Sequence, residues 1–261
     1  MLQRATMPKR FQESPAAGQD LRAKPGRWER ATNAQQRKLD RAYDSWAVAT
    51  RRELSIASAR LASPAELQAI VARRLPLLEK AMLEITGRGI IGAANLVAGR
   101  GQMPLGIQAL IVRQAAENAK LVSQSLIPHI QNQLNESINR GAMSDPKALR
   151  ESFVSLRNRP AQYAGGYWTM IFETERELGR ADERQRATQG EAPRPVRWVL
   201  DPLAEHCEGG PGFYGCRELA GEYPNWDALP TVPAGQVQCR GNCKCSLEVL
   251  VDGQWRRGLG T

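Results

Sequence analysis

The chain has 261 residues, of which 42% are apolar and 24% are charged, and its net charge at pH 7 is +9. This apolar content excludes a wholly disordered chain, and the length allows one large domain or two smaller ones. No stretch reaches the roughly 18 consecutive apolar residues of a spanning helix, so we expect no stable membrane span. The basic first ten residues lack a following apolar stretch, so we expect no secretory signal and synthesis in a reducing cytoplasm.

The positive charge is concentrated near the N-terminus. Residues 1–62 contain 13 Lys or Arg against 6 Asp or Glu, which gives +7 of the net +9. Residues 1–28, rich in Pro, Gly, Gln and charge, are expected to form a flexible basic arm. Such an arm suits a phosphate backbone, an acidic protein surface or anionic lipid, and equally a solvated tail without a partner. The candidate contact residues are Lys9, Arg10, Arg22, Lys24, Arg27, Arg30, Arg37 and Lys38.

Residues 29–190 are expected to form a helical domain with long helices. Apolar residues at steps of three and four predict a helix over 33–61, and Ser63-Pro64 predicts the capped start of a second helix that bends at Pro76 and runs to about residue 85. We interpret the glycine-rich segment 87–101 as a buried loop or hinge, with a tight helix contact or a membrane-active stretch as alternatives.

A continuous apolar stripe predicts one long helix over 104–140 with an interruption at Pro128. Asp145-Pro146 predicts the start of a shorter helix that extends to about residue 156. A further helix is expected over 161–188, and we interpret its charged second half, 173–186, as a solvated face.

Residues 191–261 are expected to form a separate small module after a proline-containing linker. Strands are predicted over 197–200 and 246–251, and Asp252-Gly253 predicts a hairpin turn into residues 254–256. The module has too few apolar residues for a firm core of its own, so we expect a metal or disulfides to stabilise it. The predicted fold class is therefore α+β: an extended part with long helices, followed by a Cys-rich β and loop module.

All five cysteines lie in this module. Their spacing is Cys207-x8-Cys216, then 22 residues, then Cys239-x3-Cys243-x-Cys245. Four thiolates can close a tetrahedral structural site, so we predict zinc bound by four of these five residues. The spacing is looser than that of a standard zinc ribbon. Disulfides formed after cell lysis and free thiols are the alternatives.

The sequence offers little support for catalysis. His129 is expected to be structural, and His206 merely precedes Cys207, which does not make a nucleophile and its base. The glutamates at 173, 175 and 177 do not share one helical face, and no phosphate-cradling glycine loop is present. We therefore expect no enzyme activity.

A longer pattern runs through residues 147–251, in which a helix leads to a tryptophan strand, an Asp, two cysteines, a turn, prolines and a closing Cys-x-Cys. Its residues are Trp198, Asp201, Cys207, Cys216, Leu219, Gly221, Pro230, Pro233, Cys243 and Cys245. In order and spacing this pattern resembles the phage Mu F-like minor head protein family, the head morphogenesis proteins of tailed phages.

The chain departs from that family in three places. Eight residues separate Cys207 from Cys216 where the family has two, and Cys239 stands where the family has a histidine before its closing Cys-Arg-Cys. The family's Ala-Arg-Thr-Glu segment would fall near residues 164–167, where Arg-Thr-Glu is absent. Cys239 is a plausible replacement ligand, and the roles of the missing side chains are not carried over.

The resemblance implies a structural virion protein inside the head, present in several copies and assembled in the host cytoplasm. Its expected partners are the portal protein, the major capsid protein or both, and the basic arm could contact packaged DNA. The alternatives are a zinc-stabilised nucleic-acid-binding protein and an enzyme with the cysteine module as its site. Co-purification with a portal at high salt would favour the first, and salt-dependent retention on DNA the second.

Overall fold

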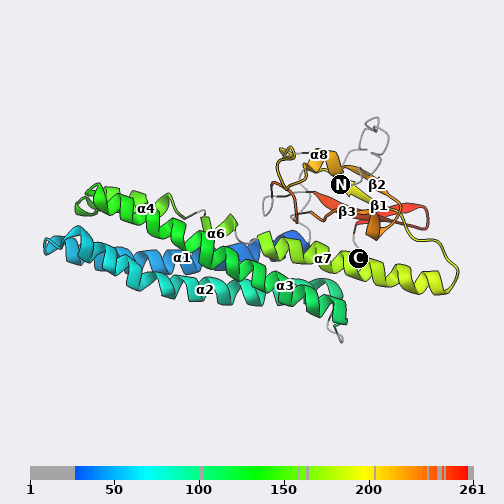
Figure 1. Ribbon diagram of the computed structural model, residues 1–261, viewed down its shortest axis with the longest axis horizontal. Helices are drawn as coiled ribbons and strands as arrows, with labels where there is room; N and C mark the ends of the chain where they lie inside the picture. The colour runs from blue at the N-terminus through cyan, green and yellow to red at the C-terminus, as the bar shows by residue number, and fades with distance from the viewer. Residues whose placement is uncertain are drawn as a thin grey trace.

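The computed structural model describes residues 27–99, 103–157, 159–162, 165–202, 204–233, 235–239, 243 and 245–257. Long helices form an elongated part, and a small sheet lies over α7 at one end of it (Figure 1). The predicted α+β class is confirmed. The basic arm falls mostly outside the described residues, except that helix α1 already begins at Arg27, one residue before the predicted end of the arm.

The helices follow the predicted order closely. They are α1 (Arg27–Ala59), α2 (Pro64–Ala98), α3 (Leu105–Leu121), the π-helical turn η1 (Val122–Leu126), α4 (Ile127–Asn139), the 3-10 turn η2 (Ala142–Ser144), α5 (Pro146–Val154), α6 (Arg159–Gln162), α7 (Gly165–Thr188) and α8 (Cys216–Leu219). No helix among these described segments is both long enough and apolar enough to cross a membrane.

The predicted N-terminal caps are confirmed. The Ser63 hydroxyl accepts a hydrogen bond from the Glu66 backbone N–H at 3.3 Å, and the Glu66 carboxylate accepts one from the Ser63 N–H at 2.6 Å. The Asp145 carboxylate accepts from the Lys147 N–H at 2.9 Å. These contacts satisfy backbone donors that have no partner within the first helical turn.

The predicted long helix is confirmed as a nearly continuous rod of α3, η1 and α4. Its interruption is the π-helical turn η1, and Pro128 lies in the first turn of α4 directly after it. Proline has no backbone N–H and cannot continue the regular hydrogen-bond ladder, so the wider turn precedes it. The buried stripe along this rod comprises Val122, Leu126, Ile130, Leu134 and Ile138.

The interpretation of residues 87–101 as a loop or hinge is wrong as far as Ala98, because α2 continues through them. Glycine is required at position 89, because a Cβ there would lie 2.3 Å from Nε2 of Gln35 on α1. That buried amide donates a hydrogen bond to the Ile85 carbonyl at 2.7 Å. The alternative of a tight helix contact is therefore correct for Gly89, whereas Gly87 and Gly92 have open space beside them.

A large apolar cluster joins α1, α2, α4 and α5. Tyr43 and Trp46 on α1 are buried in this cluster, and the polar atom of each side chain has a hydrogen-bond partner. The Tyr43 hydroxyl donates to the Phe153 carbonyl on α5, and the Trp46 indole N–H donates to the Arg74 carbonyl on α2, both at 2.8 Å. These bonds fix the three helices relative to one another without leaving a buried donor unpaired.

The C-terminal module contains a four-stranded antiparallel sheet in the order β2-β1-β3-β4. Its strands are β1 (Val196–Val199), β2 (Gly221–Tyr223), β3 (Ser246–Val251) and β4 (Gln254–Arg257). The predicted hairpin is confirmed, because Asp252 and Gly253 both have positive φ, 51° and 74°, as a two-residue turn between twisted strands requires.

The expectation that this module lacks a firm core is wrong. Its buried cluster contains Val196, Trp198, Cys216, Leu219, Trp226, Leu229, Val232, Val237, Cys243, Cys245, Leu247 and Val249, together with Phe172 of α7. Two features compensate for the small number of aliphatic residues. The tryptophans fill much volume, and three cysteines pack as core residues.

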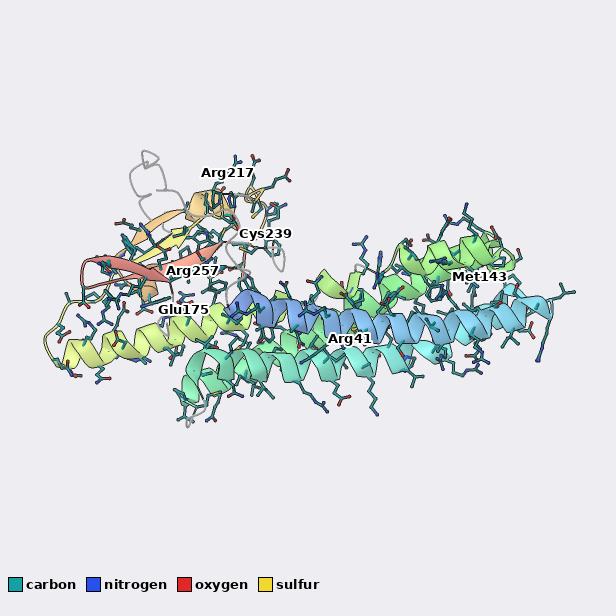
Figure 2. All side chains as sticks on the ribbon, turned by 180° about the vertical axis from the view of Figure 1, so that it is seen from behind. Arg41, Met143, Glu175, Arg217, Cys239 and Arg257 are labelled. Carbon is teal, nitrogen blue, oxygen red and sulfur yellow. The ribbon has the colours of Figure 1, made fainter. Side chains whose placement is uncertain are left out.

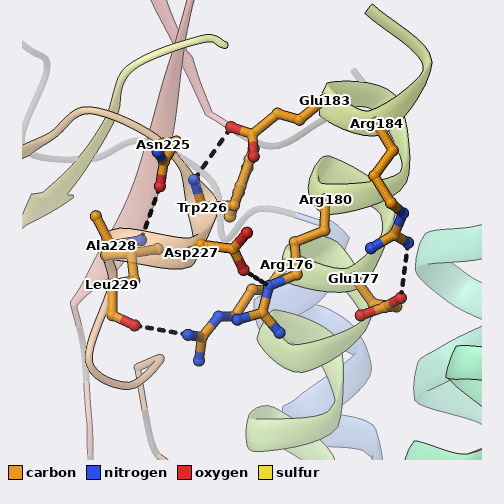
Figure 3. A network of polar contacts seen from close by, with 10 residues as sticks. All are labelled: Arg176, Glu177, Arg180, Glu183, Arg184, Asn225, Trp226, Asp227, Ala228 and Leu229. Atoms are coloured by element: carbon orange, nitrogen blue, oxygen red, sulfur yellow. Dashed lines mark hydrogen bonds and ion pairs between the residues drawn. The ribbon is translucent and has the colours of Figure 1, made fainter. Parts of the chain in front are cut away.

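The interpretation of residues 173–186 as a solvated face is also wrong, because this part of α7 supports the module (Figure 3). Arg176 donates to the Leu229 carbonyl at 2.6 Å, and Glu183 accepts from the Trp226 N–H at 3.1 Å. Gly179 allows the close approach, since a Cβ there would lie 2.2 Å from the indole nitrogen of Trp226. The carboxyl group of Glu175 is fully buried on the same helix.

Candidate metal centre

The fold brings the sulfur atoms of all five cysteines together, where the sequence predicted a site of four of the five. Cys207 lies on the loop after β1 and Cys216 begins α8, while the other three, Cys239, Cys243 and Cys245, precede β3. The Sγ atom of Cys216 lies 3.3 Å from that of Cys207 and 3.3 Å from that of Cys239. Residues far apart in the sequence thus form one sulfur cluster.

The cluster consists of two triads that share Cys216. In the first, the sulfur atoms of Cys207, Cys216 and Cys239 all lie within 4.8 Å of one another. In the second, the same holds for Cys216, Cys243 and Cys245. Ligands of one tetrahedral zinc ion with bonds of 2.3 Å are about 3.8 Å apart, so each triad is compact enough to hold a metal ion. The cluster can therefore bind a metal.

The long spacing between Cys207 and Cys216 is explained by a tight loop. The Cys216 N–H donates to the Cys207 carbonyl at 3.0 Å, and Gly210 and Phe213 exchange two hydrogen bonds of 3.0 Å inside the loop. A Cβ on Gly215 would lie 2.5 Å from the Gly209 nitrogen, so glycine is required where the two ends of the loop meet. The extra residues lengthen the loop without separating the two sulfur atoms.

The cysteine cluster is largely buried. Cys216, Cys243 and Cys245 are 1–3% exposed, Cys207 and Cys239 are half-buried, and no disulfide bond joins any two of these five described residues. The contacts of 3.3 Å are well beyond the roughly 2.05 Å of a disulfide bond.

Crowding makes it costly to ionise these thiols together. The sulfur atoms of Cys216 and Cys243, together with burial, raise the pKa of Cys245. The sulfur atoms of Cys239 and Cys243 likewise raise the pKa of Cys216. Several adjacent thiolates in an apolar core need a compensating positive charge, which a divalent metal ion supplies on binding.

Sequence reasoning missed one residue of this region, His206. Its Nε2 atom lies 2.8 Å from the Asp201 carbonyl oxygen, and its Nδ1 atom lies 3.9 Å from Sγ of Cys245. Its position directly before Cys207 is the signal that could have found it. The other histidine, His129, lies in α4 and belongs to neither of the triads.

The basic residues predicted to contact nucleic acid or an acidic surface are divided between two parts of the chain. Lys9, Arg10, Arg22 and Lys24 lie outside the described residues. Arg27, Arg30, Arg37 and Lys38 belong to α1 rather than to an arm, and the last three are exposed. They lie on the helical part of the chain and not in the cysteine module.

Two surface hollows lie away from the sulfur atoms. A groove of about 490 Å³ between α3 and α7 is lined by Gly106, Ala109, Leu110, Arg113, Glu173, Arg176, Glu177 and Arg180. A smaller one of about 290 Å³ lies where α4 meets α5. No cysteine lines either hollow, so neither gives a substrate access to the cluster.

Fold and site together define a helical protein with a small sulfur-rich module that can bind a metal. Comparison with family models, with curated proteins and with solved structures found no match to this chain. The function is therefore argued from the residues and their geometry.

Proposed function

We propose that this protein is a structural, non-catalytic component of a tailed-phage head, in which zinc stabilises the cysteine module. The observation that carries the proposal is the convergence of five sulfur atoms in the module core. The pattern resembling the Mu F-like minor head proteins supports it, since Trp198, Leu219 and three of the pattern's cysteines are buried together in this core.

The donor set favours zinc over harder metal ions. Thiolate sulfur is a soft ligand that suits zinc, whereas magnesium and calcium prefer oxygen. Four protein thiolates complete a tetrahedron and leave no position for a reacting water molecule, which is the arrangement of structural zinc sites. The absence of a cysteine from the two hollows agrees with a stabilising role.

The elongated helical part offers surfaces for partners. On α3, Leu105 is 82% exposed and Val112, two turns further along the same face, is 71% exposed. Exposed apolar side chains at this spacing suit packing against a helix of another protein. We propose the portal protein or the major capsid protein as that partner, with several copies of this chain assembling in the host cytoplasm and residing inside the head.

A second surface suits packaged DNA. Arg37, Lys38 and Arg41 lie exposed within little more than one turn of α1. Basic side chains on an accessible helix attract a phosphate backbone without reading its sequence. The same surface is the basis of the alternative function, a zinc-stabilised nucleic-acid-binding protein.

The experiment that tests the proposal is co-expression with a portal protein of a tailed phage, followed by purification at high and low salt. We expect a complex that survives high salt, because apolar contacts are not screened. The double variant Arg37→Glu/Lys38→Glu, which changes charge without touching α3, serves as the control and should keep the complex. Loss of the complex at high salt, with retention on DNA at low salt, would favour the alternative.

The zinc site is tested separately by elemental analysis of protein purified under reducing conditions. We expect about one zinc per chain. A chain that is folded and free of metal after such a purification would contradict the stabilising role of zinc.

A further inference from the structure

The region of the cysteine cluster contains a sixth side chain able to bind metal. His206 is half-buried in the loop that precedes Cys207, and its ring lies between the Asp201 carbonyl and the Cys245 sulfur atom. The second triad offers only three sulfur atoms, those of Cys216, Cys243 and Cys245. A tetrahedral metal ion bound there needs a fourth ligand.

Hydrogen bonding fixes the tautomer of this histidine. The Asp201 carbonyl oxygen can only accept a hydrogen bond, so Nε2 of His206, 2.8 Å away, carries the proton. In the neutral ring Nδ1 then has a free lone pair, and this atom faces Cys245. A ring held at one nitrogen by a backbone carbonyl, with the other nitrogen toward the metal, is the usual arrangement of metal-binding histidines.

The distance also suits two ligands of one ion. With metal–sulfur bonds of about 2.3 Å and metal–nitrogen bonds of 2.0–2.1 Å, tetrahedral nitrogen and sulfur ligands are about 3.6 Å apart. The observed separation between Nδ1 of His206 and Sγ of Cys245 is 3.9 Å. His206 is not within 4.8 Å of all three sulfur atoms of the second triad, so metal binding would draw the imidazole ring toward Cys216 and Cys243 as well.

We propose that His206 is a metal ligand, and that with Cys216, Cys243 and Cys245 it forms a site of three sulfur atoms and one nitrogen atom. This inference rests on the proposed metal-binding role of the cluster and specifies its ligands. Cys207 and Cys239 then pack against Cys216 outside this set. A site made of four sulfur atoms is the competing arrangement.

Cobalt(II) is a suitable probe, because its absorption spectrum distinguishes sulfur from nitrogen ligands. We compare the wild type with His206→Ala, His206→Cys and the control His129→Ala, measuring spectra and the apparent affinity by chelator competition. Loss of one ligand should weaken cobalt binding by at least about tenfold, since even an outer-shell partner contributes that much. His206→Cys should restore binding with a stronger sulfur-to-cobalt charge-transfer band, and His129→Ala should match the wild type.

The outcomes separate this inference from the proposed function. If the wild type binds no cobalt, the metal-binding role itself fails. If the wild type binds cobalt and His206→Ala keeps its spectrum and affinity, the cluster binds metal through sulfur alone and the inference is overturned. If His206→Ala does not fold, His206→Cys decides: an added thiolate band supports the inference, and a spectrum identical to the wild type overturns it.

Discussion

The buried carboxyl group of Glu175 predicts a specific dependence of stability on pH. Glu175 lies on α7 with 0% of its surface exposed, and neither carboxyl oxygen has a hydrogen-bond partner among the described residues. Burial raises its pKa from 4.5 to about 8, and the nearby Arg257 on β4 opposes this only in part (Figure 2). The folded protein therefore keeps this group protonated at neutral pH.

The sign of the effect follows from the two pKa values. Between pH 4.5 and about 8 the folded state binds a proton that the unfolded state has lost, so the free energy of unfolding falls as pH rises. Each pKa unit corresponds to about 1.4 kcal/mol, which gives a loss on the order of 4 kcal/mol by pH 7.5. Glutamine has the same shape and does not titrate, so Glu175→Gln should remove this loss.

Urea unfolding at several pH values between 5 and 7.5, followed by circular dichroism, measures the effect. We expect Glu175→Gln to match the wild type near pH 5 and to exceed its stability increasingly toward pH 7.5. Glu173→Gln, on the same helix but partly exposed, is the matched control and should show no such divergence. A constant difference between Glu175→Gln and the wild type across this range would refute the reasoning.

Four further substitutions test the packing. Gly179→Ala should destabilise the protein by about 1–3 kcal/mol, because the added methyl group collides with the Trp226 indole. Gly92→Ala has open space around it and should stabilise the protein by about 0.5–1 kcal/mol. Equal thermal midpoints for the two variants would contradict this. Cys216→Ser removes the sulfur atom common to both triads, so it should make residues 191–257 sensitive to protease while helical circular dichroism is retained, and a wild-type digestion pattern would count against it. Tyr43→Phe removes the hydrogen bond to the Phe153 carbonyl, which keeps its bond from the Leu156 N–H, so it should cost about 0.5–1.5 kcal/mol in chemical denaturation; no measurable loss would exclude a contribution from that bond.

Local signals predicted much of the fold. The caps at Ser63 and Asp145, the apolar stripe of α3 to α4 and the Asp252-Gly253 hairpin all depend on neighbouring residues, so they can be read without knowledge of the tertiary structure. The cysteine cluster was predictable for a different reason. Thiols gathered in one segment and absent elsewhere indicate a common site even when their exact pairing is open.

The errors arose where distant residues decide the outcome. The glycines after residue 86 favour a loop by propensity, but Gly89 stays helical because Gln35 of another helix packs against it. The charged residues of α7 predict a solvated face by their sequence pattern alone, but in the structure the module covers this part of the helix and Glu175 is buried. His206 was dismissed as a catalytic base, and its orientation toward Cys245 depends on a loop conformation that sequence spacing does not reveal.

Helix α7 belongs to two cores at once. Met170 and Ile171 are buried in the cluster formed with α2 and α3, while the next residue, Phe172, is buried in the module. Moving the cysteine module relative to α2 and α3 would therefore require α7 to bend, or one of its two buried faces to separate from the residues packed against it.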